Sequence, residues 1–157
     1  MRLLLQRVRQ AGVRCQGQDI SGIGPGLLVL AGFGAQDGPD LPAMKSWQTV
    51  LKKLVGLRIF PDAGGKMNQD LLEHGGQLLV VSQFTLYADL QRGRRPSFSA
   101  AAPPEVARIL YQRLLEDLEG LAPGRVAGGV FGGDMDVTLV NWGPVTMQLD
   151  SDDFGNP

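Results

Sequence analysis

The hydrophobic positions in the first third of the chain follow the pattern of a sheet. Apolar residues dominate 2–8, recur in short pieces near Val13 and Ile20, and form an uninterrupted run over 27–31. A continuous apolar run of this length is typical of a strand that is buried on both faces. The pattern therefore predicts strands at each of these places, so the chain begins as sheet.

Two later stretches have the three- and four-residue spacing of amphipathic helices. The first is expected to start at Asp40, a candidate N-cap, and to end at Gly56, with its apolar face formed by Met44, Trp47, Leu51, Leu54 and Val55. The second begins near Pro103-Pro104-Glu105, and its apolar face is formed by Ala107, Leu110, Leu114, Leu118 and Leu121. Both helices are expected to cover a sheet.

The remaining apolar segments are short and read as strands. We expect strands over 57–60 and 78–81, then a polar loop over 88–102 and a glycine-rich connection over 124–133. Alternating positions predict two further strands, over 135–140 and 145–150, joined by 141–144. The fold is therefore expected to be α+β, a single compact domain over 1–150 with mixed sheets and two main helices on one side, followed by a loose polar tail over 151–157.

Composition narrows the class of protein. A chain of 157 residues suits one domain, and a net charge of −1 argues against a protein that coats duplex DNA through bulk electrostatics. Its single cysteine, Cys15, cannot form an intramolecular disulfide, and the N-terminus does not resemble a signal peptide. The longest apolar stretch, 26–33, is far below the ~20 residues that span a bilayer. We expect a soluble, cytoplasmic protein with no membrane association.

The usual catalytic side chains are scarce. His74 is the only histidine and lies in a predicted turn, so a solvated loop residue is favoured over a catalytic base or a member of a triad. One cysteine and one histidine cannot make a zinc site, and the acidic pairs at 134–136 and 150–153 read as a strand edge and a solvated tail. No nucleotide-binding fingerprint is present. We expect no metal and no cofactor.

Two short segments place small polar groups where strands end. Ser82-Gln83-Phe84-Thr85-Leu86-Tyr87 follows a buried strand, and Asn141-Trp142-Gly143-Pro144-Val145-Thr146 interrupts another. A glycine allows close backbone approach and a proline fixes the local geometry, so these segments suit a pocket built from main chain. Taken alone, the hydroxyls of Ser82 and Thr85 are more often structural than nucleophilic. The run from Arg92 to Arg95 reads equally well as an anion site or a solvated charge run.

Taken together, these motifs resemble the D-aminoacyl-tRNA deacylase family. The resemblance rests on the Ser82–Leu86 run, on Arg95-Pro96-Ser97-Phe98, and on Asn141 to Thr146, in this order, with supporting pieces over about 145 residues. It implies a β/β/α layered fold and a homodimer that hydrolyses the ester of D-aminoacyl-tRNA, and of glycyl-tRNA, without a cofactor. It also implies a cis Gly143-Pro144 peptide that reaches into the partner's pocket and rejects L-amino acids. From the residues alone, Gly24-Pro25 and Gly38-Pro39 are equal candidates for a cis bond.

The resemblance also assigns roles to individual residues. Ser82, Gln83, Phe84 and Thr85 would form the catalytic segment, with oxyanion stabilisation by the N–H groups near Phe84 and Thr85. Substrate binding would fall to Leu86, Asn141, Val145 and Thr146. Arg7 would brace the Gly-Pro segment, and Arg94 and Arg95 would lie near the tRNA acceptor end.

One position departs from the family pattern, and two other functions stay open. Trp142 stands where a small or acidic residue is usual, and we expect it to pack across the dimer interface. One alternative is a nucleic-acid-binding dimer without turnover, since relatives of this fold have been linked to DNA replication origins. The other is a related editing enzyme with a trans Gly-Pro peptide and a preference for L-amino acids. The intact motifs favour the deacylase, with no DNA as a partner.

Overall fold

The computed structural model describes residues 1–91 and 93–155, and its centre is one mixed sheet. The strand order is β2-β1-β3-β6-β7, and β8 pairs with β1. β1 runs antiparallel to its three neighbours, whereas β3, β6 and β7 run parallel to one another. The strands are β1 (Arg2–Cys15), β2 (Gln18–Ile23), β3 (Gly26–Gly32), β6 (Gln77–Ser82), β7 (Val126–Gly128) and β8 (Met135–Asp150).

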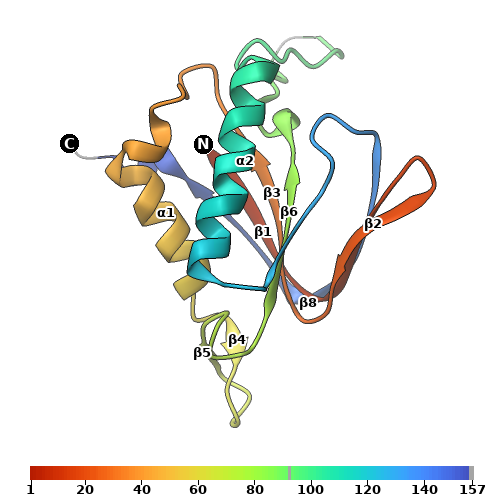
Figure 1. The fold of residues 1–157 in the computed structure, drawn as a ribbon, viewed down its shortest axis with the longest axis vertical. Coiled ribbons are helices and arrows are strands. Elements are labelled where there is room, and N and C mark those ends of the chain that lie inside the picture. The colour runs from red at the N-terminus through yellow and green to blue at the C-terminus, as the bar shows by residue number, and fades with distance from the viewer. Residues whose placement is uncertain (92, 156–157) are drawn as a thin grey trace.

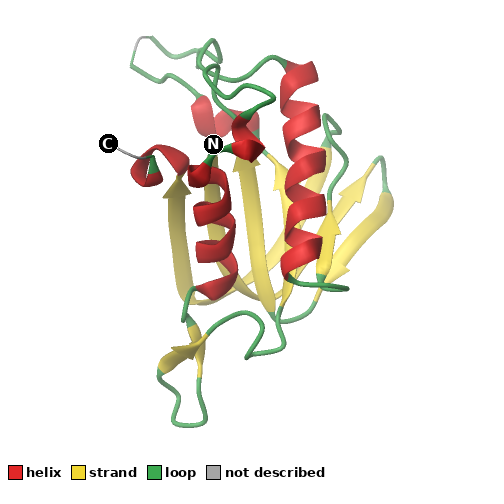
Figure 2. Cartoon of the chain, turned by 60° about the vertical axis from the view of Figure 1, so that its left-hand side comes forward, coloured by secondary structure: helices red, strands yellow, loops and turns green. Residues whose placement is uncertain are grey.

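Two helices, α1 (Lys45–Gly56) and α2 (Pro104–Leu121), lie side by side on one face of this sheet (Figures 1 and 2). Their apolar faces and the facing strands form the main core, whose largest fully buried side chains include Trp47, Phe60, Leu51 and Leu78. The short strands β4 (Phe60–Pro61) and β5 (Met67–Gln69) pair in a separate small sheet. Three 3₁₀ helices complete the chain: η1 (Leu41–Ala43), η2 (Phe84–Tyr87) and η3 (Ser151–Phe154).

The other face of the central sheet has its own core. A second cluster contains Val8, Val13, Ile23, Leu28 and Leu79, so it joins the later half of β1 and β2 to β3 and β6. Figure 1 shows β2 on the far side of the sheet from α1. The molecule is therefore built in β/β/α layers, and the predicted α+β fold with two helices on one side is confirmed.

The alternation of β1 changes face part-way along the strand because of a β-bulge. Leu3 and Leu5 belong to the helix-side core, whereas Val13, which plain alternation would place on the same face, belongs to the second cluster with Val8. The register against β8 shifts between Val8 and Gln10, which leaves Arg9 as the extra residue. Such a bulge exchanges the faces of all later side chains. The strand predicted over 2–8 and the piece near Val13 are consequently one continuous strand.

Several other element bounds differ from the prediction. α1 begins at Lys45 after Met44, because the 3₁₀ turn of η1 intervenes, so Asp40 does not cap it. The strand expected over 57–60 is reduced to Phe60–Pro61.

The C-terminal part of the chain is more ordered than the prediction. β8 is continuous from Met135 to Asp150, so 141–144 are part of a strand and not a connector between two. The tail is not loose in its first four residues, which form η3: Ser151 is buried and Phe154 packs against the main core. Residues 156–157 of the predicted tail lie outside the described residues. Among the helices of the described residues, none has both the length and the apolar character needed to cross a membrane.

Candidate active site

The first motif leaves the sheet at the carboxyl end of β6. Ser82 is the last residue of β6, and the chain then turns into η2, which contains Phe84 and Thr85. The Gln83 N–H donates to the Ala31 carbonyl oxygen of β3 (2.7 Å), which fixes the start of this turn to the sheet. The first N–H groups of a helix lack partners within it. The backbone at Phe84 and Thr85 can therefore present donors to a ligand.

The side chains of this segment provide polar groups but no general base. Thr85 is exposed, and the Gln83 amide Nε2 donates to its Oγ1. An amide cannot accept a proton from a hydroxyl at neutral pH, so this contact can orient Thr85 without activating it. The Phe84 ring is also exposed and meets Phe98 edge-on at 4.9 Å between centroids, which connects η2 to the following loop.

Arg94 and Arg95 lie in that loop and are exposed. The loop is held by paired backbone hydrogen bonds between Asp89 and Ser97 (2.8 and 3.0 Å). An open cleft of about 520 Å³ lies at its base and is lined in part by Arg2, Tyr87 and 88–91. The structure therefore places the two arginines at the same end of the sheet as η2. Arg92, the first residue of the predicted arginine run, lies outside the described residues.

The second motif forms a wide bulge in β8. Gln6 of β1 is opposite Thr146 and Val8 is opposite Asn141, so 142–145 face Arg7 alone. The Asn141 side chain closes the bulge: its Oδ1 accepts from the Val145 N–H (2.9 Å) and its Nδ2 donates to Thr146 Oγ1 (3.0 Å). Asn141 and Thr146 are thus occupied in shaping the main chain between them.

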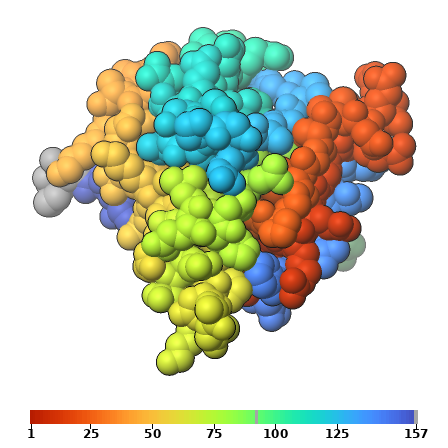
Figure 3. Space-filling view, turned by 60° about the horizontal axis from the view of Figure 1, so that its bottom comes forward, coloured from red at the N-terminus to blue at the C-terminus, as the bar shows by residue number. Residues whose placement is uncertain are grey.

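Gly143 and Pro144 lie exposed at the tip of this bulge. Their peptide bond is cis, as the resemblance implied, and it is the only cis bond found in the described residues. Gly143 has φ +138°, a conformation that residues with a side chain rarely adopt. Figure 3 views the end of the molecule where β8, in blue, reaches the surface beside β1 and β2, in red.

Arg7 supports the bulge from below. The residue is 7% exposed, and its Nε donates to the Trp142 carbonyl oxygen (2.8 Å) while Nη1 donates to the Ile59 carbonyl oxygen. Burial lowers the pKa of the Arg7 guanidinium, and the nearby positive charge of Arg9 lowers it further. The Trp142 ring packs on Arg7 within the same chain, and His74 packs on Trp142. His74 is half-buried and stacks on Phe60 at 4.7 Å between ring centroids, so it is a packing residue.

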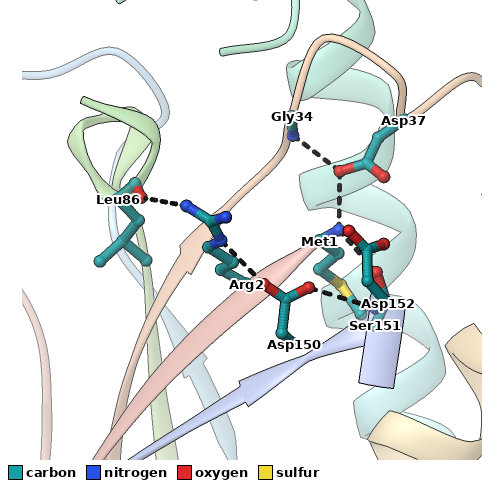
Figure 4. Close-up of polar contacts among 8 residues, drawn as sticks. All are labelled: Met1, Arg2, Gly34, Asp37, Leu86, Asp150, Ser151 and Asp152. Carbon is teal, nitrogen blue, oxygen red and sulfur yellow. Dashed lines mark hydrogen bonds and ion pairs between the residues drawn. The ribbon is translucent and has the colours of Figure 1, made fainter. Parts of the chain in front are cut away.

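A contact that the sequence analysis did not predict links the first motif to β8 (Figure 4). Arg2 at the start of β1 pairs with Asp150 at the end of β8 (Nε to Oδ2, 2.8 Å), donates to the Leu86 carbonyl oxygen (3.1 Å), and lies over the Tyr87 ring (4.4 Å). Burial would raise the pKa of Asp150, but hydrogen bonds from Arg2 and from the Asp152 N–H bring it below its usual value. Burial also raises the pKa of Tyr87.

The end of β8 is fixed by a second contact beside this pair. The Met1 α-ammonium lies within 2.8 Å of Asp37 Oδ2 and donates to Ser151 Oγ (2.7 Å), which attaches η3 to the start of β1 (Figure 4). The only sequence signals for this network are two charged residues. Arg2 begins one apolar segment, and Asp150 ends another. Those signals do not identify partners 148 residues apart.

The two motifs do not meet within one chain. Ser82 pairs with Ala31, Ala31 with Leu3, and Leu3 with Leu149, whereas the Gly-Pro bulge lies opposite Arg7. Four residues along β1 correspond to about 13 Å, and three strand spacings add roughly another 14 Å across the sheet. A single chain therefore presents the two motifs at separate places on its surface.

The sequence profile of one family, described as D-Tyr-tRNA(Tyr) deacylase, matches residues 4–150. The chain belongs to this deacylase family. It is 61% identical over 155 residues to the D-aminoacyl-tRNA deacylase of Solidesulfovibrio magneticus, covering 99% of this chain and 98% of the relative. It is 59% identical over 150 residues to the D-aminoacyl-tRNA deacylase of Nitratidesulfovibrio vulgaris, covering 96% and 93%.

A solved structure also matches this member of the deacylase family. That protein, described as a c-Myc DNA unwinding element binding protein, is 36% identical, with a TM-score of 0.86 and coverage of 96% of this chain and 98% of the other. The predicted family and fold are confirmed by these comparisons. The deacylase fold is therefore shared with a protein whose description refers to DNA.

Proposed function

We propose that the chain hydrolyses the ester that joins a D-amino acid to the 3′-terminal adenosine of tRNA. Family membership supports this hydrolase activity, and the observation that carries it is a pair of main-chain motifs, one at the end of β6 and one in the β8 bulge. Water would attack the carbonyl carbon, the bond to the ribose oxygen would break, and free D-amino acid and tRNA would leave. Glycyl-tRNA, which has no side chain to exclude, would be a second substrate.

The catalytic contribution of the chain would be mainly electrostatic. An aminoacyl ester is already activated, and the neighbouring ribose 2′-hydroxyl can assist the hydrolysis of this ester. The backbone N–H groups of Phe84 and Thr85 would stabilise the developing oxyanion, an interaction often worth ~10²–10³ in rate per donor. Ser82 and Gln83 would hold this segment against β3 through the bond from Gln83 to Ala31.

Thr85 would position the substrate and not act as a nucleophile, because its hydroxyl contacts the Gln83 amide and no base. Thr85→Val removes the hydroxyl and keeps the branched shape. We expect a rate loss of less than about tenfold, much smaller than the ~10⁴-fold or greater loss that follows removal of a nucleophile. Single-turnover release from D-tyrosyl-tRNA measures this directly. Loss of nearly all turnover with tRNA binding intact would instead assign a chemical role to Thr85.

The active species would be a homodimer, because one chain keeps its two motifs apart. A second copy would bring its Gly143-Pro144 bulge to the Leu86 side of the first motif and complete the pocket with Val145 and Thr146. Ile20, Leu139 and Val140 are apolar and exposed on β2 and β8, which is the kind of surface that a partner covers. Sedimentation of the full chain would give its mass in solution, and a monomer that still hydrolyses the ester would exclude this arrangement.

Stereoselectivity would come from the main chain of the bulge. Gly143 and Pro144 are exposed at its tip, and carbonyl groups held rigidly beside the Cα of a substrate would exclude an L side chain while they tolerate hydrogen or a D side chain. Arg94 and Arg95, exposed near η2, would bind phosphates of the acceptor end. We also place the chain in the cytoplasm, since its one cysteine, Cys15, has no intramolecular partner for a disulfide.

The deciding experiment compares release of amino acid from D-tyrosyl-tRNA and L-tyrosyl-tRNA in parallel, with and without a chelator, and with a Pro144→Ala variant alongside. Rapid D-selective release that the chelator does not affect supports the proposal. Reduced selectivity in the variant supports a gate, by which we mean the exclusion of L side chains by the main chain of Gly143 and Pro144. The 36% identical protein is described as a DNA unwinding element binding protein, so DNA binding is the alternative outcome. No release from either ester, with DNA still bound, would contradict the deacylase proposal.

A further inference from the structure

Trp142 forms an unusual contact at the first position of the bulge. Its half-buried ring lies beneath two guanidinium groups, with the carbon of Arg7 4.7 Å and that of Arg9 4.4 Å from the ring centroid. His74 approaches the same ring at 5.7 Å and stacks on Phe60 behind it. Trp142 therefore joins the bulge in β8, the strand β1 and the turn after β5 in one aromatic and cationic cluster.

The two arginines of this cluster have no acidic partner. In the described part of the chain, the ion pairs involve Arg2, Arg14, Arg58 and Arg113, and none involves Arg7 or Arg9. Two guanidinium groups around one ring repel each other, and the buried one cannot be screened by water. The negative π-face of an indole is attracted to cations and offsets part of this repulsion. The Trp142 ring thus attracts both Arg7 and Arg9, which have no carboxylate partner among the described residues.

Arg7 transmits this contact to the main chain of the bulge. Its Nε donates to the Trp142 carbonyl oxygen, and a Cβ built on Gly143 would be only 2.8 Å from its Nη2. The guanidinium therefore lies directly against Gly143, while its central carbon is 4.7 Å from the centroid of the Trp142 ring. The ring, the guanidinium and the main chain of the bulge are therefore in direct contact with one another.

We propose that Trp142 is a positioning residue for stereoselectivity: its ring holds Arg7 and Arg9 and so fixes the main chain of Gly143 and Pro144. This inference rests on the proposed gate, and it adds the residue that orients the gate, Trp142. It also assigns a role to Arg9, an exposed residue that forms no ion pair within the described residues.

The first test changes the ring itself. Trp142→Ala removes both cation–π contacts, and we expect the ratio of D-tyrosyl-tRNA to L-tyrosyl-tRNA hydrolysis to fall about fivefold to thirtyfold. Trp142→Phe keeps an aromatic face and is expected to stay within about threefold of the wild-type ratio. The ratio is a suitable measurement because a general loss of folded protein lowers both rates equally and leaves it unchanged.

The second test changes the exposed arginine. Arg9→Ala is expected to lower the D-to-L ratio about twofold to fivefold. The matched control is Arg108→Ala. Arg108 lies on α2, and its replacement removes a cation–π contact of the same kind, to the Phe131 ring. The control should leave the ratio unchanged. Trp142 fluorescence gives a readout without substrate, since the other tryptophan, Trp47, is fully buried: Arg9→Ala should alter the emission and Arg108→Ala should not.

The outcomes separate this inference from the gate on which it rests. If Pro144→Ala lowers the D-to-L ratio while Trp142→Ala keeps the wild-type ratio, the gate stands and the role of Trp142 is refuted. If neither variant changes the ratio, the gate itself is refuted, and the positioning role falls with it. A reduced ratio in both, with recovery in Trp142→Phe, supports the inference.

Discussion

Gly143 is the position where the smallest change should have a large effect. In Gly143→Ala the new Cβ would lie 2.8 Å from both Arg7 Nη2 and Val145 Cγ2, and 3.1 Å from the Val145 nitrogen. Arg7 cannot simply swing away, because it is buried and bonded to two carbonyl groups. The φ of +138° adds backbone strain that an alanine does not tolerate.

The expected cost follows from these two effects. Strained backbone at a residue with a side chain costs about 1–3 kcal/mol, and overpacking costs about 1–3 kcal/mol. A total near 3 kcal/mol is a substantial part of a typical stability of ~5–15 kcal/mol. If the bulge keeps its shape, we expect Tm to fall by roughly 6–12 °C. If the bulge moves to relieve the clash, Tm changes little and the D-to-L ratio falls instead.

The assay pairs thermal unfolding by circular dichroism with hydrolysis of both esters. Gly120→Ala is the matched control, since Gly120 lies in α2 with no atom within 4 Å of its added Cβ. That variant should be neutral or slightly more stable, because alanine favours helix more than glycine does. A Gly143→Ala variant with wild-type Tm and wild-type selectivity would refute the argument that the bulge needs glycine.

Three further predictions concern the charged residues. Arg7→Met leaves two main-chain carbonyl groups without their donor, so we expect the free energy of unfolding to fall by about 2–4 kcal/mol. Urea unfolding should show a lower midpoint at unchanged slope, and an unchanged midpoint would contradict this supporting role of Arg7. Because the pKa of Asp150 is lowered by pairing with Arg2, the pair stabilises the fold above pH ~4 and this contribution is lost as pH falls through the lower folded value. Asp150→Asn should therefore lose less stability below pH ~4 than wild type, and equal losses in the two proteins would refute the assignment. Joint replacement of Arg94 and Arg95 by alanine should reduce the salt dependence of tRNA binding, with the slope of log K against log salt smaller by about 1.4–1.8; an equal slope in a filter-binding titration would exclude phosphate contacts.

The sequence predicted most of the fold because periodicity is a local property. The apolar spacing of α2 and the buried runs of β3 and β6 were visible without any partner. It failed where tertiary contacts overrode local signals. A Gly-Pro pair normally ends a strand, yet β8 continues past it because Asn141 bridges the bulge and β1 pairs on both sides. Likewise, the bulge at Arg9 hid the full length of β1 by reversing its alternation.

The candidate site was predictable only as far as it depends on contiguous segments. Ser82 to Leu86 follows a buried strand and was recognised for that reason. The contact from Arg2 to Asp150 and Leu86 joins residues far apart in sequence and carries no local pattern. The contacts of Trp142 with Arg7 and Arg9 of its own chain also carry no local pattern, and its place at a dimer interface stays a prediction.

The strands shared by the two cores join the layers of the molecule. Since β1, β3 and β6 each supply side chains to the cores on both faces of the sheet, we expect the opening of one layer to disturb the packing of the other. The backbone amides of β1 should therefore be among the last to exchange with solvent deuterium. The Gly-Pro bulge pairs with β1 on both sides, so we expect its exposed main chain to be held by a part of the molecule that resists local unfolding.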